Sequence, residues 1–66
     1  MRTKLKILRI KHQLTQDEIA ARLGYKRAYF GHVESGHMGG SQEFWQRLQN
    51  AFQLTDDELQ ELKAID

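Results

Sequence analysis

Residues 15–36 read TQDEIAARLGYKRAYFGHVESG and contain two short amphipathic segments that meet at Gly24. A turn of about three or four residues between two helices needs a residue that tolerates a positive φ angle, and glycine does so without steric cost. Ala20 is small, so two helices that cross near it can bring their backbones close together. The pattern therefore predicts a helix-turn-helix. Its inner faces carry apolar residues at helical spacing: Ile19, Leu23, Phe30 and Val33.

The other side of the same two segments is polar and basic. Amide, ammonium, guanidinium and imidazole groups are the side-chain groups that contact phosphates and base edges in DNA complexes. This outward side is therefore the candidate functional surface. Its residues are Gln16, Lys26, Arg27, Ala28, Tyr29 and His32.

Several short motifs agree with one known family. Leu8-Arg9 matches the Leu-Arg of its first helix, and Leu14-Thr15-Gln16 matches the Leu-Ser/Thr-Gln that opens its second. Glu34-Ser35-Gly36 stands where the family has Glu-Asn-Gly, and residues 41–59 follow its fourth and fifth helices. Over residues 5–59 the chain resembles the phage-repressor and Cro class, also called Xre-like regulators. The resemblance implies an all-α fold, a compact five-helix lambda-repressor-like DNA-binding domain with the helix-turn-helix at helices 2 and 3.

We expect five helices from the start and stop signals along the chain. Two capping boxes, Thr15 with Glu18 and Thr55 with Glu58, mark the starts of the second and fifth helices. Ser41 is the expected N-cap of the fourth. The first helix is expected over Thr3–His12, the second ends near Leu23, and the third covers Lys26–Ser35 and ends at Gly36. The expected inner faces outside the helix-turn-helix contain Leu5, Leu8, Phe44, Trp45, Leu48, Ala51, Phe52, Leu59, Leu62 and Ile65.

The chain has 66 residues, which we interpret as one domain, residues 1–66. A domain near this size buries only about 60% of its unfolded surface, so its stability is expected to be modest. The absence of cysteine excludes a disulfide framework and a thiolate metal site. No apolar run is long enough for a membrane span, and the basic N-terminus lacks the apolar core of a signal peptide. We therefore expect a cytoplasmic protein that does not contact membranes.

The net charge of +1 conceals an asymmetry between the two halves of the chain. Residues 1–33 contain eight Lys and Arg against two acidic residues, a net charge of +6, whereas residues 34–66 contain two against seven, a net charge of −5. A basic half attracts a polyanion and an acidic half repels it. The alternative is surface charge without function. Most of the basic residues lie on or before the helix-turn-helix, which favours the first interpretation.

The resemblance implies that the helix at residues 26–34 enters the major groove of double-stranded DNA while the second helix lies across the backbone. Arg27 is expected to read a guanine through O6 and N7, Ala28 to touch a thymine methyl group and His32 to contact a base edge. Contacts to the DNA backbone are expected from the side chains of Gln16, Lys26 and Tyr29 and from the backbone amides of Gly39, Gly40 and Ser41.

Simpler roles stay open for some of these residues. His32 and Lys26 can be ordinary exposed side chains, and Tyr29 can be an aromatic cover for Phe30. In the family, the arginine of the first helix pairs with the glutamate that ends the recognition helix. The resemblance therefore implies a structural ion pair between Arg9 and Glu34, against the alternative of two unrelated exposed charges.

Two features depart from the family pattern. Residues 37–40, HMGG, lack the fixed charge and the proline of the family's loop, so we expect a flatter salt dependence of DNA binding. Gly31 costs the recognition helix about 1 kcal/mol relative to alanine. A close approach of its backbone to DNA would account for a glycine there.

The function that we expect is sequence-specific transcription regulation, by a Cro-like repressor that binds a palindromic operator as a homodimer. Such a protein would be nucleoid-associated and encoded by a bacterium or a phage. The dimer interface is expected at the Trp45 region, at residues 59–65, or at Ile7 and Ile10. The alternative is an antitoxin or anti-repressor on the same fold, whose acidic helices 4 and 5 bind a protein partner.

We do not expect an enzyme, a cofactor or a metal site. The sequence shows no nucleophile with an evident base and no glycine loop of the kind that cradles phosphate. The run Asp56-Asp57-Glu58 is explained by helix capping. The three histidines lack the i, i+4 spacing of metal ligands and have no cysteine companions.

Overall fold

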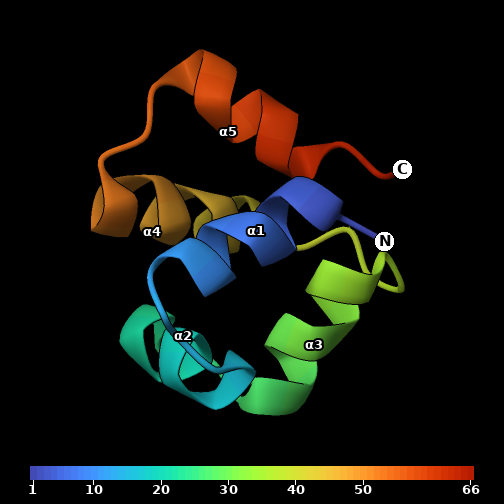
Figure 1. Ribbon diagram of the computed structural model, residues 1–66, viewed down its shortest axis with the longest axis vertical. Coiled ribbons are helices and arrows are strands. Elements are labelled where there is room, and N and C mark those ends of the chain that lie inside the picture. Colours follow the sequence, from blue (N-terminus) through green and yellow to red (C-terminus); the bar gives the residue numbers. More distant parts are fainter.

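The computed structural model describes all 66 residues and contains five α-helices and no strand (Figure 1). The all-α, five-helix fold expected from the sequence is confirmed, and the helix boundaries agree with expectation to within one residue. The helices are α1 (Thr3–Lys11), α2 (Gln16–Leu23), α3 (Arg27–Ser35), α4 (Gln42–Phe52) and α5 (Asp56–Lys63).

Local signals start and stop these helices as the sequence predicts. Thr15 accepts a hydrogen bond from the Glu18 amide, and the Glu18 carboxylate accepts one from the Thr15 amide. Thr55 and Glu58 repeat this capping box at α5. Hydrogen bonds to the threonine lower the pKa of each glutamate. The bond to the threonine backbone has the larger effect, and the bond to its side chain has the smaller one. Gly24, with φ of 81°, ends α2 in the left-handed conformation that glycine adopts freely.

The helices bury one common core. Leu5, Phe30 and Phe44 are fully buried, so α1, α3 and α4 each contribute a large side chain to it. Two expectations for the inner faces are wrong: Ile65 lies beyond α5 with 58% of its surface exposed, and Ala51 is exposed on α4. The buried apolar residues are Leu5, Ile19, Ala20, Leu23, Phe30, Val33, Phe44, Trp45, Leu48, Leu59 and Leu62.

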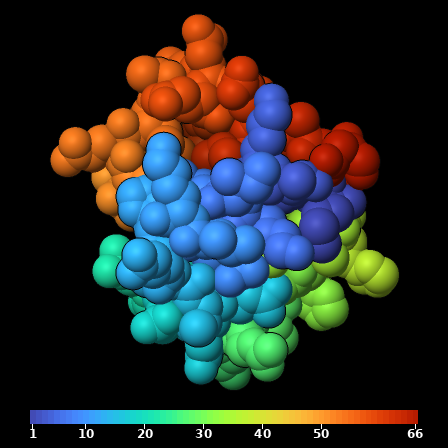
Figure 2. Space-filling view, in the orientation of Figure 1, coloured from blue at the N-terminus to red at the C-terminus, as the bar shows by residue number.

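The arrangement separates the helix-turn-helix from the last helix. In Figure 1, α2 and α3 lie at the bottom, α5 lies at the top, and α1 and α4 lie between them. Figure 2 shows the consequence for the surface: the basic first half of the chain, blue to green, fills the lower part of this face, and the acidic α5 forms its top. Each of the five helices is too short or too polar to cross a membrane.

Arg2 is a buried charge that the sequence does not announce. Only 4% of its surface is exposed, and Nη1 donates to the Val33 carbonyl at 2.6 Å. Burial lowers the pKa of this guanidinium, because desolvation disfavours its charged form. A single side chain therefore ties the end of α3, the loop that follows it and the end of α5 together. The four carbonyls that accept hydrogen bonds from Arg2 belong to Val33, Met38, Gly39 and Lys63.

We predict that Arg2→Ala lowers the free energy of unfolding by roughly 2–4 kcal/mol, because four carbonyls each lose a charged donor and packed stem atoms are removed. Urea denaturation followed by circular dichroism measures the loss. Arg22→Ala is the matched control, since Arg22 is exposed on α2, and its loss should stay within about 0.5 kcal/mol. Equal losses in the two variants would show that Arg2 does not hold these segments together.

Candidate nucleic-acid interface

A shallow hollow of about 550 Å³ lies on the outer side of the helix-turn-helix. Lys26, Arg27, Ala28 and His32 are all exposed around it, and Ala28 is its one apolar residue. Pockets for small organic ligands bury most of the ligand's surface, and a hollow this shallow does not enclose one. It brings together four of the residues that the sequence singled out on the recognition helix. Gln16 and Gly31 complete the lining.

The inner side of α3 is fixed by a buried carboxylate. Glu34 has 3% of its surface exposed, and its Oε2 accepts a hydrogen bond from Arg9 Nε at 2.8 Å. Gln16 Nε2 donates to the other oxygen, Oε1, at 2.9 Å. Arg9 lies on α1 and Gln16 on α2, so this single carboxylate joins three helices. The ion pair between Arg9 and Glu34 is thus a structural contact with little exposure, 14% and 3% for the two side chains.

This network changes the expectation for Gln16. One hydrogen of its side-chain amide is committed to Glu34, so Gln16 is first a residue that joins α2 to α3. The same amide lies over Gly31: a Cβ atom there would be 3.7 Å from Gln16 Oε1, which is an ordinary contact. Gly31 is half-buried beneath Gln16 and does not lie on the fully exposed side of α3. The helix could therefore accept alanine at this position without a clash.

The first turn of α3 differs from those of the other helices. Thr15, Ser41 and Thr55 cap α2, α4 and α5, and Asp66 accepts from the first amide of α1. Lys26 is the N-cap of α3 and makes no such side-chain hydrogen bond. The positive end of the α3 dipole is therefore left open beside the hollow, where an anionic oxygen can satisfy its amides.

One expectation for the backbone contacts, the Ser41 amide, needs correction, and Tyr29 has a structural role that the sequence did not indicate. The Ser41 amide donates to the Tyr29 hydroxyl oxygen at 3.0 Å, so it is not free to bind a phosphate. Tyr29 is half-buried, and its ring stacks on Tyr25 at 5.0 Å and meets the edge of Phe44 at 5.6 Å. Its side chain faces the α3–α4 loop, away from the hollow. Tyr29 therefore acts first as a brace between α3 and α4.

The loop between α3 and α4 is shaped by Trp45. The indole nitrogen of Trp45 donates to the Gly39 carbonyl at 3.0 Å. Gly40 has φ of 79°, and a Cβ atom there would lie 2.7 Å from that nitrogen, so a side chain would collide with the ring. Gly40 is thus required for packing against Trp45, a reason that the sequence did not reveal. At Gly39 a Cβ atom would meet open space.

Arg47 on α4 is a further residue that sequence reasoning missed. Its Nη1 donates to the Leu23 carbonyl at 2.9 Å, at the C-terminal end of α2, and its guanidinium lies 5.3 Å from the centre of the Tyr25 ring. A cation at a helix C-terminus is favourable, and here it fixes the turn that joins α2 to α3. A Cβ atom on Gly24 would lie 2.8 Å from the same nitrogen. Glu43, four residues earlier on α4, is a local partner of Arg47, but no local pattern indicates its contact with Leu23, which lies 24 residues away.

Comparison with known proteins gives one match. A family model described as a helix-turn-helix domain matches residues 1–62. The corresponding comparisons with curated proteins and with solved structures give no match.

We predict that Arg9→Ala lowers the free energy of unfolding by about 3–5 kcal/mol, because Glu34 is left as an uncompensated buried charge. Lys11→Ala is the matched control on the same helix: Lys11 is exposed, and its loss should stay within about 0.5 kcal/mol. Urea denaturation of both variants at one temperature measures the difference. Similar losses would mean that the buried carboxylate does not depend on Arg9.

Proposed function

The chain belongs to the helix-turn-helix domain family, and from this premise we propose that it is a sequence-specific, double-stranded DNA-binding transcription regulator of the Xre-like kind. In this proposal residues 1–66 act as one domain, and α3 enters the major groove while α2 lies across the DNA backbone. The protein acts by binding DNA and needs no cofactor. It represses transcription by occupying a palindromic operator as a homodimer.

The observation that carries this proposal is the contrast between the two sides of α3. Its inner side is buried through Phe30, Val33 and Glu34. Its outer side presents Arg27 and His32, both exposed, around a shallow hollow beside a helix N-terminus that no side chain caps. A recognition helix contacts base edges with the residues near its N-terminal end, which is where Arg27 lies; His32 follows on the same side, in the last turn of α3.

We assign the reading of bases to three residues on this side. Arg27 can donate two hydrogen bonds to O6 and N7 of a guanine, the commonest specific contact in the major groove. The methyl group of Ala28 suits contact with a thymine methyl group. His32, one turn further along α3, can donate to or accept from a base edge.

Contacts to the DNA backbone position α3 but read no sequence. Lys26 supplies a cation at the start of α3. Gln16 still has one amide hydrogen for a phosphate, and the bond to Glu34 holds that amide in place. The amides of Gly39 and Gly40 and the hydroxyl proton of Tyr29 are further candidates; the amide of Ser41 is not.

The distribution of charge supports one orientation on DNA. The first turn of α5 contains Asp56, Asp57 and Glu58 and lies at the far end of the molecule from α3 (Figure 1). Repulsion between this acidic end and phosphate keeps α5 away from the duplex, while Lys26 and Arg27 are attracted to it. Approach with α3 foremost is therefore favoured before any base is contacted.

A homodimer follows from the small number of bases that one α3 helix can reach. Two copies related by a two-fold axis place two recognition helices about 34–36 Å apart, which is one turn of DNA. Selection of bound sequences from random duplexes tests this directly. Recovery of an inverted repeat with half-sites one turn apart is the expected result, and recovery of no preferred sequence would contradict sequence-specific binding.

We predict that Arg27→Ala removes about 1–3 kcal/mol of discrimination between the selected operator and a random duplex, because the guanine contact is lost. Binding isotherms on both duplexes at one salt concentration measure this. The fold should be unchanged, since Arg27 is exposed and its side chain makes no hydrogen bond within the protein. Unchanged discrimination would remove Arg27 from the reading role.

Lys26→Ala provides the comparison for a residue that contacts only phosphate. We predict that it weakens binding to operator and random duplex by similar factors and flattens the plot of log affinity against log salt by about one phosphate contact. Affinities measured at several salt concentrations give the slope. If Lys26→Ala altered base preference while leaving the slope intact, Lys26 would be a base-reading residue.

A further inference from the structure

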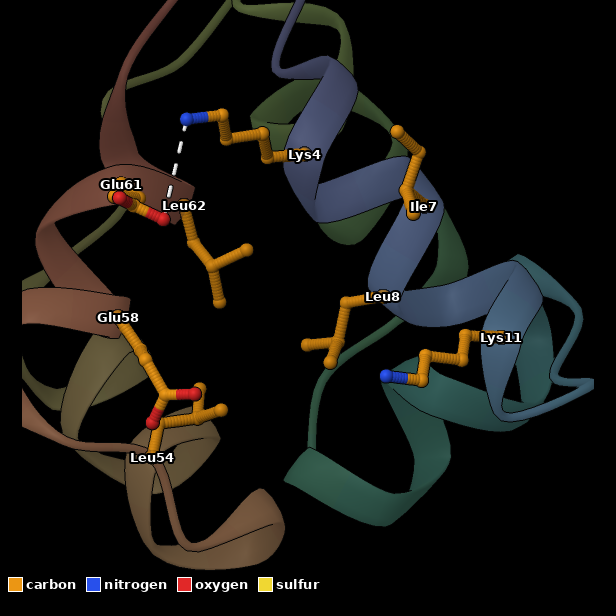
Figure 3. A pocket seen from close by; sticks show the side chains of 8 residues that line it. All are labelled: Lys4, Ile7, Leu8, Lys11, Leu54, Glu58, Glu61 and Leu62. Carbon is orange, nitrogen blue, oxygen red and sulfur yellow. Dashed lines mark ion pairs between the residues drawn. The ribbon is translucent and has the colours of Figure 1, made fainter.

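A second groove lies far from the recognition surface, between α1 and α5. Leu8 on α1 and Leu62 on α5 point toward one another across it, and Leu54 lies at one end (Figure 3). Figure 2 shows the surface recessed here, between the blue atoms of α1 and the orange and red atoms of α5. None of these residues takes part in the proposed contacts with DNA. The groove is lined by Lys4, Ile7, Leu8, Lys11, Leu54, Glu58, Glu61 and Leu62.

The size of the groove points to side chains as its occupant. Its volume is about 240 Å³. Pockets for small-molecule ligands commonly measure about 300–1,000 Å³ and bury most of the ligand, so this groove is small for such a role. It is large enough for apolar side chains of another protein surface. Two exposed apolar side chains stand on the same helix, Ile7 with 56% and Ile10 with 55% of their surface exposed.

The charges of the two walls are opposite. The α1 wall carries Lys4 and Lys11, and the α5 wall carries Glu58 and Glu61. Lys4 Nζ lies 3.9 Å from Glu61 Oε2. Hydrogen bonds from Thr55 are the main cause of the lowered pKa of the Glu58 carboxyl, and the charge of Lys11, on the opposite wall, adds to them. The first turn of α1 thus faces the second half of α5, and one groove wall carries the basic residues while the other carries the acidic ones.

A surface with one basic and one acidic wall is complementary to itself. If a second copy is rotated by 180° about an axis parallel to the groove, the basic wall of each copy faces the acidic wall of the other, at the same height along the axis. Lys4 of each copy then lies opposite Glu61 of the other. The four side chains, Lys4 and Glu61 of both copies, alternate in the sign of their charge. An axis across the groove would oppose like charges, so electrostatics selects the first arrangement.

We propose that the α1–α5 groove is the homodimer interface of this protein, with α1 of each copy against α5 of the other. Ile7 of each copy packs against the apolar floor of the second copy's groove, and Ile10 widens the apolar contact. The inference deepens the proposed function, because it names the surface through which the DNA-binding homodimer forms. The inference rests on the proposed function only for the purpose of the dimer, because the contact between the two copies forms without DNA.

Sedimentation equilibrium of the full chain without DNA tests the interface. The wild type should form a dimer with rising concentration, and Ile7→Glu should weaken dimerisation about tenfold or more, because a charge then faces an apolar floor twice in each dimer. Lys6→Glu is the matched control: Lys6 is exposed on α1 but does not line the groove, and its variant should dimerise like the wild type. Circular dichroism checks that both variants keep their helix content.

A charge exchange tests the arrangement of the walls. Lys4→Glu alone and Glu61→Lys alone should each weaken homodimers, because each places like charges opposite one another at two symmetric positions. A mixture of the two variants should form heterodimers about tenfold or more tighter than either homodimer, because opposite charges then face each other at both positions. Gln60→Lys, exposed on α5 outside the groove, is the control for added charge on that helix.

Three outcomes would overturn the proposal. If the wild type stays monomeric at all concentrations, the groove is not a homodimer interface. A dimer that Ile7→Glu leaves intact would place the interface elsewhere. A mixture of the two charge variants that restores nothing would exclude this pairing of walls. Binding of the same variants to a single half-site duplex, measured separately, shows whether DNA recognition survives, so failure of the interface is distinct from failure of the proposed function.

Discussion

The carboxylate of Glu34 is the contact on which the rest of the helix-turn-helix depends. A carboxylate this deeply buried is tolerated only when its oxygens are paired and hydrogen-bonded, and here Arg9 from α1 and Gln16 from α2 supply the donors. The requirement fixes three helices relative to one another. The same bonds orient α3 so that Arg27 and His32 lie on its free side. The contacts of Glu34, near the C-terminal end of the helix, thereby determine which residues of α3 are available to DNA.

The arginines divide between structure and recognition in a way that residue counts conceal. Arg2, Arg9 and Arg47 all donate to buried or capping carbonyls and carboxylates inside the molecule. The positive charge of the first half of the chain is therefore not all available to a polyanion, since two of its arginines are committed to α3 and its loop. Arg22 and Arg27 remain exposed. Attraction of a polyanion therefore depends on where the exposed cations lie, more than on their number.

Features encoded within a few residues could be predicted from the sequence. The capping boxes at Thr15 and Thr55 and the left-handed turn at Gly24 are local, so their residues suffice to locate the helix ends. The interactions of Arg2, Arg47 and the Tyr29–Ser41 pair join segments that are distant in the sequence, and no local pattern selects their partners. The candidate site followed the same division: its position on α3 was predictable, whereas the loss of the Ser41 amide to Tyr29 and the binding of Gln16 to Glu34 required the three-dimensional arrangement.

The central claim is that the outer side of α3 contacts DNA. Chemical-shift mapping by nuclear magnetic resonance, with an unlabelled single half-site duplex titrated into isotope-labelled protein, tests it residue by residue. We expect the largest changes on Lys26, Arg27, Ala28 and His32, with little change along α5. Changes confined to α1 and α5, with α3 unaffected at saturating duplex, would contradict it.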